Sequence, residues 1–340
     1  MKSNYFLERN KQNTKHIANY LEDMPDFCFE FFIGMENYTS TLTRMNYAMD
    51  LRIFFDYLSK FKFNKEIKSI NLSDLDKLTS TDIESFLSYL TYYTFDDKNY
   101  HNGERGKSRK LASVRSFLKF FYNKDKLTSN VASKIQTPKL HQKDIIRLEV
   151  DEVAKIINEA ENSSFDSKTQ SSYNKHTSKR DVAILSVFLG TGIRVSELVG
   201  LNVEAIDFAS NAFKITRKGG NQVVLYFSDE VKDALLIYKK QRDELEVDNN
   251  AFFLSLQKKR ISTRAVQNLV KKFSRKVNPL KKISPHKLRS TYGTNLYRET
   301  NDIYVVADVL GHKDVNTTKR HYAAISEDIR RNAANKVKLR

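Results

Sequence analysis

Two cationic side chains lie three residues apart in the segment ISPHKLRSTYGT, at His286 and Arg289. Ser284 is a favourable N-cap residue and Pro285 suits a first helical turn, so the segment predicts a helix that begins here. Residues at this spacing share one face of a helix, and the amino end of a helix favours an anion. The pattern indicates an anion site, and the alternative is a surface helix with an incidental His and Arg.

A third cation, Arg194, follows the apolar run DVAILSVFLGTGI. Gly190 and Gly192 interrupt the helical pattern, and a second helix is predicted to begin near Ser196. An arginine held between two buried helices has few conformations, and its planar guanidinium donates two parallel hydrogen bonds to a phosphate. Glu197 would either orient Arg194 or form an ordinary structural ion pair with it.

The segment DIYVVADVLGHKDVNTTKRHYAAI contains a further histidine and a tyrosine. Gly311 is predicted to end one helix and Asn316 to cap the next, with His312 in the turn between them. Tyr322 follows ten residues after His312 and comes directly after the cationic run KRH. A tyrosine has a pKa of about 10, so as a nucleophile it needs nearby positive charge or a base. The alternative is a tyrosine that only packs.

Lys218 lies in the clearest β pattern of the chain, residues 212–227, where AFKIT and VVLYF flank RKGGNQ. The pair Gly219 and Gly220 supplies the backbone freedom that a tight hairpin needs. Lys218 is therefore expected at or beside the hairpin tip, where a lysine can reach into a site without forming its wall. The alternative is a solvated lysine, as most hairpin lysines are.

Helices must position these residues, because ten Gly and four Pro leave few breaks and most of the chain has a period of 3.6. Residues 38–58 predict an amphipathic helix, as do residues 107–122, in which basic side chains take the face opposite the apolar one. Thr81 and Glu84 suggest a capping box. The apolar stripes of the two helices are Leu42, Met45, Met49, Ile53, Phe54 and Tyr57, and Leu111, Val114, Phe117, Leu118 and Phe121.

The predicted fold is mainly α with a small β-sheet in an α+β second domain. Residues 137–147, TPKLHQKDIIR, contain a proline and little apolar pattern, which is typical of a linker. We therefore expect an N-terminal extension over 1–26, a helical domain over 27–136 and a second domain over 148–340. The polar stretch over residues 162–179 is expected to be a surface loop.

The composition favours a polyanionic partner, since 58 Lys and Arg outweigh 41 Asp and Glu by 17 charges. Nucleic acid is the first candidate and an anionic membrane surface the second. Cys28 is the single cysteine, and no Cys and His cluster has zinc-site spacing, so neither an internal disulfide nor a metal is suggested. With no long apolar run and no secretory signal, we expect a cytoplasmic protein.

Taken together, the candidate residues form an ordered set: Arg194, Lys218, His286, Arg289, His312 and Tyr322. Their segments TGIRVSEL, RKGG, HKLR, LGH and RHY resemble the tyrosine recombinase, or phage integrase, family over about residues 145 to 330. The whole chain is most similar to the Xer branch of XerS type, although integrases of phages and conjugative elements share every motif. The His312 to Tyr322 interval is ten residues, whereas many members have nine.

The resemblance implies a helical, SAM-like core-binding domain and a catalytic domain that clamp a specific double-stranded DNA site. It implies that Tyr322 attacks a phosphodiester to give a 3′-phosphotyrosine and a free 5′-hydroxyl, without metal, ATP or another cofactor. Arg194, Arg289 and His312 would bind the non-bridging oxygens, and Lys218 would protonate the leaving oxygen. His286 would help with the tyrosine proton or the transition-state charge.

The implied assembly is a homotetramer on two DNA sites that exchanges strands through a Holliday junction, with an accessory directionality factor as a further partner. The segment after Tyr322 would pack on a neighbouring protomer or fold back on its own domain. The implied role is chromosome dimer resolution or mobile-element integration. Two alternatives are an inactive DNA-binding or architectural protein on this scaffold and a relaxing topoisomerase of the same chemistry. A basic helical protein of another role is the remaining alternative.

Overall fold

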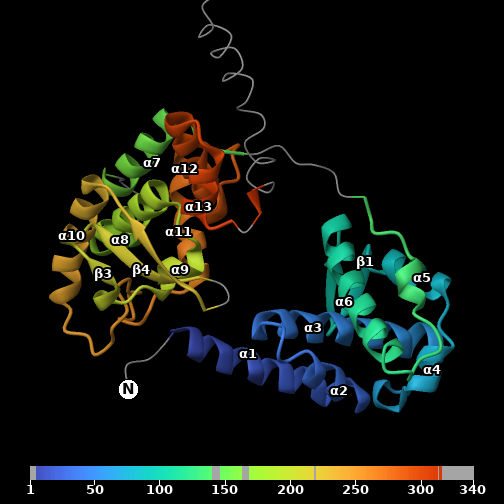
Figure 1. The fold of residues 1–340 in the computed structure, drawn as a ribbon. Coiled ribbons are helices and arrows are strands. Elements are labelled where there is room, and N and C mark those ends of the chain that lie inside the picture. The colour runs from blue at the N-terminus through green and yellow to red at the C-terminus, as the bar shows by residue number, and fades with distance from the viewer. Residues whose placement is uncertain (1–4, 140–145, 163–167, 218–219, 313, 316–340) are drawn as a thin grey trace, which may run out of the picture. The chain divides into compact units, whose positions relative to one another are not determined.

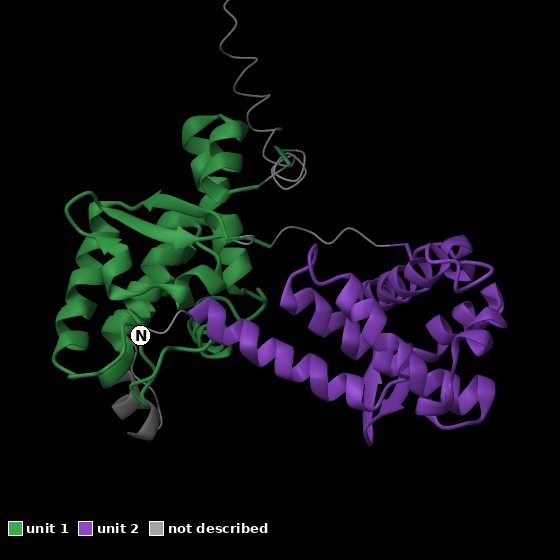
Figure 2. Cartoon of the chain, turned by 60° about the horizontal axis from the view of Figure 1, so that its bottom comes forward, with its two compact units in different colours: residues 1–3, 144–340 green, residues 4–143 purple. Residues whose placement is uncertain are grey.

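The structure is a computed structural model, and it describes residues 5–139, 146–162, 168–217, 220–312 and 314–315. The described residues fall into two compact units, one within residues 4–143 and one within residues 144–340 (Figures 1 and 2). Both consist mainly of helices with a small antiparallel sheet, which confirms the predicted fold class. No helix in the described part of the chain has the length and hydrophobicity to cross a membrane.

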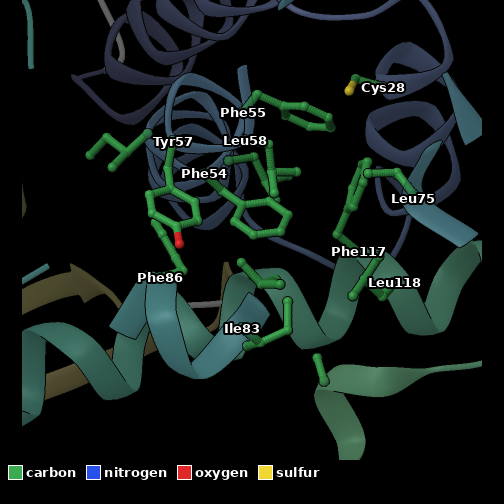
Figure 3. Packing of buried hydrophobic residues seen from close by; sticks show 14 of the residues in the cluster. Cys28, Phe54, Phe55, Tyr57, Leu58, Leu75, Ile83, Phe86, Phe117 and Leu118 are labelled. Atoms are coloured by element: carbon green, nitrogen blue, oxygen red, sulfur yellow. The ribbon is translucent and has the colours of Figure 1, made fainter. Parts of the chain in front are cut away.

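The N-terminal unit consists of helices around an aromatic core. Phe54 and Phe86 are fully buried and meet edge to face, an arrangement that aromatic pairs favour (Figure 3). The first helix adds Ile17 and Leu21 to the same core, so it packs as part of this unit. The elements are α1 (Tyr5–Glu22), α2 (Phe27–Gly34), α3 (Thr41–Tyr57), the π-helix η1 (Leu58–Phe63), η2 (Ile67–Ser69), α4 (Leu72–Asp76), α5 (Ser80–Tyr89), β1 (Tyr92–Phe95), β2 (Lys98–His101), α6 (Glu104–Tyr122) and η3 (Val131–Lys134).

Two predictions for this unit are wrong in detail. In α3, Leu42 and Met49 of the predicted apolar stripe are exposed, whereas Ala48 and Leu51 are buried, because α3 packs against both α1 and α6. The capping box at the start of α5 is formed by Thr79 and Asp82 rather than by Thr81 and Glu84. The Thr79 N–H donates to Asp82 Oδ2 at 2.8 Å, so an aspartate takes the place usually filled by glutamate.

The hairpin of β1 and β2 was not predicted. Its turn residues, Asp96 and Asp97, both have positive φ, as a type I′ turn requires. Only Tyr93 and Phe95 turn inward from β1, and β2 is exposed throughout. Strands of only four residues are too short to leave a clear periodic signal in the sequence.

Helix α6 confirms the predicted apolar face, since its five predicted positions are all buried. Its basic face is less uniform than expected, because Lys110 is only 4% exposed and its Nζ lies 3.9 Å from the Asp50 carboxylate. Arg109 donates to the same carboxylate at 2.6 Å, and burial raises the pKa of Asp50 while these cations oppose the rise. The prediction that basic side chains take the face opposite the apolar one is therefore wrong at Lys110, because a buried carboxylate requires a counter-charge.

The second unit contains the predicted hairpin and most of the candidate site residues. Its elements are α7 (Val150–Asn162), α8 (Lys168–Thr191), α9 (Val195–Gly200), η4 (Val203–Ala205), β3 (Ile206–Asp207), β4 (Ala212–Thr216), β5 (Gln222–Tyr226), α10 (Asp229–Asp243), α11 (Thr263–Val277), α12 (Pro285–Thr300) and α13 (Ile303–Leu310). The three strands form one antiparallel sheet in the order β3-β4-β5, and Thr216 pairs with Gln222 at the end of the hairpin next to its turn.

Part of the predicted surface loop is helical. Helix α8 begins at Lys168, so residues 168–179 form its first turns, while residues 163–167 lie outside the described residues. The polar stretch contains neither Gly nor Pro, and polar composition without a breaker does not prevent a helix. The prediction of a loop over the whole stretch was therefore wrong.

Candidate active site

Arg194 lies at the turn between α8 and α9, as the sequence predicts. Gly192 makes this turn possible, because its φ is +61° and an added Cβ would lie 2.5 Å from Cδ1 of Tyr292. Glu197 is buried, and its two carboxylate oxygens accept from the Arg194 backbone N–H and from Arg194 Nη1, both at 2.9 Å. Glu197 therefore fixes both the backbone and the side chain of Arg194.

Arg289 and His286 lie in the first turns of α12, which begins at Pro285 with Ser284 at the N-cap position. Arg289 is buried, and its Nη1 donates to the backbone oxygen of Gly192 at 2.5 Å. Its Nη2 donates to the backbone oxygen of Leu310. Three residues earlier, His286 is exposed. Arg289 therefore joins the α8–α9 turn to the end of α13.

The end of α13 brings the predicted residues together. Gly311 has a φ of +62°, and the N–H groups of Gly311 and His312 donate to Asp308 and Ala307, which is the pattern of a Schellman motif. Gly311 therefore ends the helix as predicted, and His312 lies in the turn. Nη2 of Arg194 donates to the Gly311 oxygen at 3.1 Å, one residue beyond the carbonyl that holds Arg289.

Sequence reasoning missed a third arginine at this point. Arg217 follows β4, and its Nη2 donates to the Val309 oxygen at 2.9 Å. Three guanidinium groups thus bind consecutive carbonyls of one helix end, Arg217 on Val309, Arg289 on Leu310 and Arg194 on Gly311. These carbonyls carry the negative end of the helix dipole, which favours cations. The available sequence signal was an arginine directly before Lys218.

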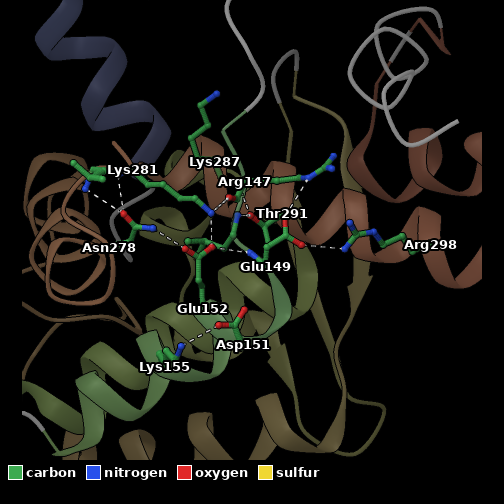
Figure 4. A network of polar contacts seen from close by, with 12 residues as sticks. Arg147, Glu149, Asp151, Glu152, Lys155, Asn278, Lys281, Lys287, Thr291 and Arg298 are labelled. Carbon is green, nitrogen blue, oxygen red and sulfur yellow. Dashed lines mark hydrogen bonds and ion pairs between the residues drawn. The ribbon is translucent and has the colours of Figure 1, made fainter. Parts of the chain in front are cut away.

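A separate polar network joins α12 and the segment before it to the first residues of this unit (Figure 4). The backbone N–H of Leu148 donates to Oγ1 of Thr291, two residues after Arg289, at 3.0 Å. Lys281, just before α12, donates to the Arg147 oxygen at 3.2 Å and to Glu152 at 2.6 Å. The first residues of this unit are therefore bonded directly to the helix that carries His286 and Arg289.

The structure thus brings Arg194, Arg289 and the turn of His312 to one point and places His286 on the same helix as Arg289. Lys218 and Tyr322 lie outside the described residues. Within the described residues, no three His, Cys, Asp or Glu side chains are grouped to hold a metal ion. An array of charged N–H donors from several buried elements suits the oxygens of a phosphate.

The sequence profile of the phage integrase family matches residues 147–328, more than half of the chain. The chain belongs to this family of tyrosine recombinases. It is 35% identical over 316 residues to the tyrosine recombinase XerC of Caldanaerobacter subterraneus subsp. tengcongensis, a match that covers 88% of the chain and 84% of the relative. With the tyrosine recombinase XerS of Lactococcus lactis subsp. lactis the identity is 28%, covering 95% and 96%.

The fold also matches a solved tyrosine recombinase. A crystal structure of XerH site-specific recombinase bound to palindromic difH substrate has a TM-score of 0.66 and 16% sequence identity to the chain. The match covers 87% of the chain and 80% of XerH. The predicted resemblance to Xer tyrosine recombinases is therefore confirmed, and relatives of both the XerC and the XerS name share it.

Proposed function

We propose that the chain is a site-specific recombinase that cleaves and rejoins double-stranded DNA through a 3′-phosphotyrosine at Tyr322. The observation that carries the proposal is the convergence of Arg194 and Arg289, which lie 95 positions apart in the sequence, on neighbouring carbonyls of one helix end. Two guanidinium groups that are held on neighbouring carbonyls repel each other, so their convergence favours an anionic partner. They suit a ligand with two anionic oxygens.

In the proposed mechanism these arginines bind the non-bridging oxygens of the scissile phosphate. Charge increases on these oxygens in the pentacoordinate transition state, so donors aimed at them stabilise it more than the ground state. The Arg194 side chain is 35% exposed although its partner Glu197 is buried, so it can meet a phosphate without leaving that carboxylate. His312, in the next turn position after Gly311, is proposed as a third donor.

Three roles rest on the family resemblance. The Tyr322 oxygen attacks phosphorus in line, the bond from phosphorus to the 5′-oxygen breaks, and that oxygen takes a proton from Lys218. His286 assists the tyrosine proton or the transition-state charge. A 5′-hydroxyl of a second duplex then attacks the phosphotyrosine and releases Tyr322. The phosphate ester is exchanged rather than hydrolysed, so the cycle has no need of ATP.

We propose that α11 and α6 contribute to the DNA interface. On α11, Val266, Leu269, Val270 and Phe273 face the core, and the exposed side carries Arg264, Lys271 and Arg275. On α6, Arg105 and Lys119 are exposed, whereas Lys107 and Arg115 bond to Thr91 and to residues 132–137 of their own unit. The net charge of +17 makes most of this affinity phosphate-derived and strongly salt-dependent.

The proposed organisation places a core-binding domain over residues 27–136, a linker over 137–147 and the catalytic domain over 148–340. Four protomers would hold two DNA sites and exchange strands through a Holliday junction in the cytoplasm. Resolution of chromosome dimers and integration of a mobile element both fit this reaction. A deletion strain separates them, because only loss of a resolvase leaves a fraction of cells with unresolved chromosomes at division.

The proposed function is tested with a duplex that the protein itself selects from a random-sequence pool. A copy with a nick close to the scissile phosphate traps cleavage, since the short strand diffuses away and religation fails. We expect a protein band that carries covalent DNA through denaturing electrophoresis. Specific binding without this band would indicate the inactive architectural protein, and efficient relaxation of supercoiled plasmid without the selected site would indicate a topoisomerase.

A second prediction concerns Lys218. Lys218→Ala is expected to reduce cleavage of the ordinary nicked duplex by roughly 100-fold or more, within the range of general acid catalysis. When sulfur replaces the leaving 5′-oxygen, the rate should recover to near that of the unmodified protein, because a thiolate leaves without protonation. Single-turnover rates on the two substrates provide the measurement. Equal losses on both would remove Lys218 from the acid role.

A further inference from the structure

Arg217 lies where the β4–β5 hairpin meets the end of α13, and the proposed mechanism gives it no role. Its Nη2 donates to the Val309 oxygen at 2.9 Å, and Nη1 makes a longer contact of 3.5 Å with the Asp308 oxygen. Its backbone N–H donates to the Asn221 oxygen at 2.8 Å, which extends the hairpin ladder by one bond. One residue therefore belongs to the hairpin through its backbone and to α13 through its side chain.

The fit between Arg217 and α13 depends on the absence of a side chain at Gly311. A Cβ at Gly311 would lie 1.8 Å from Nη1 and 2.3 Å from Cζ of Arg217. The guanidinium therefore occupies space beside the α13 backbone that only glycine leaves open. Gly311 thus allows both the left-handed turn before His312 and the close approach of Arg217.

The charge of the Arg217 guanidinium suits the C-terminal end of α13. Burial lowers the pKa of the Arg217 guanidinium, Glu197 opposes that effect, and the nearby Arg194 adds to it. An arginine nevertheless stays charged in proteins, so Arg217 is a cation held beside another cation. The attraction that offsets this repulsion comes from the terminal carbonyls of α13.

We propose that Arg217 is a positioning residue, which fastens the β4–β5 hairpin to the end of α13 so that the hairpin and the His312 turn act on one phosphate. The inference rests on the proposed function. Lys218 directly follows Arg217 in the sequence, so a misplaced hairpin impairs the delivery of its proton to the leaving oxygen first. Binding of the non-bridging oxygens, which Arg194 and Arg289 perform, is affected less.

The test is Arg217→Ala in the full chain, assayed on the nicked duplex with an oxygen or a sulfur leaving atom. We expect a loss of roughly 10-fold to 100-fold with oxygen, the scale on which small misplacements reduce rates. With sulfur the loss should nearly vanish, as it does for Lys218→Ala. If Arg217 bound the phosphate itself, Arg217→Ala would reduce the cleavage rates of both substrates by the same factor, and that result would overturn the proposal.

Two controls separate positioning from loss of charge. Lys214→Ala removes an exposed cation from the same strand and should leave both rates unchanged. Arg217→Lys keeps the charge without the planar fork, so we expect it to restore only part of the oxygen-substrate rate. Full activity of Arg217→Lys would show that charge alone suffices and would contradict the positioning role.

Hydrogen exchange of the DNA-free protein tests the fastening independently of the chemistry. Arg217→Ala should accelerate exchange of the β4 and β5 amides while the amides of α8 and α11 keep their protection. Unchanged exchange in the hairpin would overturn the proposal whatever the cleavage rates are. A different outcome is accelerated hairpin exchange in Arg217→Ala while the sulfur substrate fails to rescue Lys218→Ala. That outcome would reject the acid role of Lys218, but Arg217 would still hold the hairpin on α13.

Discussion

Tyr322→Phe is expected to abolish the covalent protein–DNA band completely, with binding to the selected duplex unchanged. Phenylalanine keeps the aromatic ring but lacks the phenolic oxygen that is proposed to attack phosphorus, and its side chain carries no other nucleophile. The measurement is denaturing electrophoresis of the nicked duplex after incubation with each protein. Gel-shift titration of the same duplex verifies that binding persists.

Tyr304→Phe is the matched control for this experiment. Tyr304 is 70% exposed on α13, in the same unit, and precedes Tyr322 by 18 positions. Its phenol should contribute nothing to cleavage, so this variant should give the full covalent band. A band that persists in Tyr322→Phe would assign the nucleophile to another residue, and peptide mapping of the adduct would identify it.

Arg289→Ala is expected to reduce the single-turnover cleavage rate by about 100-fold or more, the usual effect of removing one oxyanion donor. The sulfur substrate should not rescue this variant, because the loss is at the non-bridging oxygens rather than at the leaving atom. Arg194→Ala should behave in the same way. The two rates together distinguish phosphate binding from the proton delivery proposed for Lys218.

The structural contacts of Arg289 require a control, since its loss also removes bonds to Gly192 and Leu310. Arg289→Lys retains a cation, and Arg298→Ala removes an arginine from the same helix. Arg298 forms a 3.5 Å ion pair with Glu149, a partly exposed contact worth about 0 to 1 kcal/mol. Cleavage by Arg298→Ala should match that of the unmodified protein. If it fell as far as Arg289→Ala, a general loss of α12 stability would explain both.

The sequence predicts the helices and strands of this chain best where the hydrophobic periodicity ends at the same place as a helix- or strand-breaking residue. The hairpin of β4 and β5, the end of α13 at Gly311 and the buried face of α6 all follow from such local patterns. The hairpin of β1 and β2 was missed because its strands are too short to show a period. The burial of Lys110 depends on Asp50, 60 positions earlier, and no local pattern contains that partner.

The candidate site shows the same division. Motif order singled out Arg194 and Arg289, and the structure places both at one helix end. Arg217 was not predicted as a site residue. Its side chain binds backbone oxygens of α13 that lie about 90 positions away in the sequence, and a single sequence does not reveal such contacts. Every residue has a backbone carbonyl, so the residue type does not show which carbonyl will accept a hydrogen bond. The partners of a side chain that binds only carbonyls therefore cannot be identified from the sequence.

The binding of Arg194 and Arg289 to carbonyls at the end of α13 implies that the proposed phosphate site is preorganised. An arginine side chain loses about 2 kcal/mol of rotamer entropy when it is fixed in one geometry. Here the helix end fixes the guanidinium groups of Arg194 and Arg289 before any DNA arrives, so folding rather than substrate binding bears that cost. Part of the binding energy that DNA supplies thereby remains to stabilise the transition state.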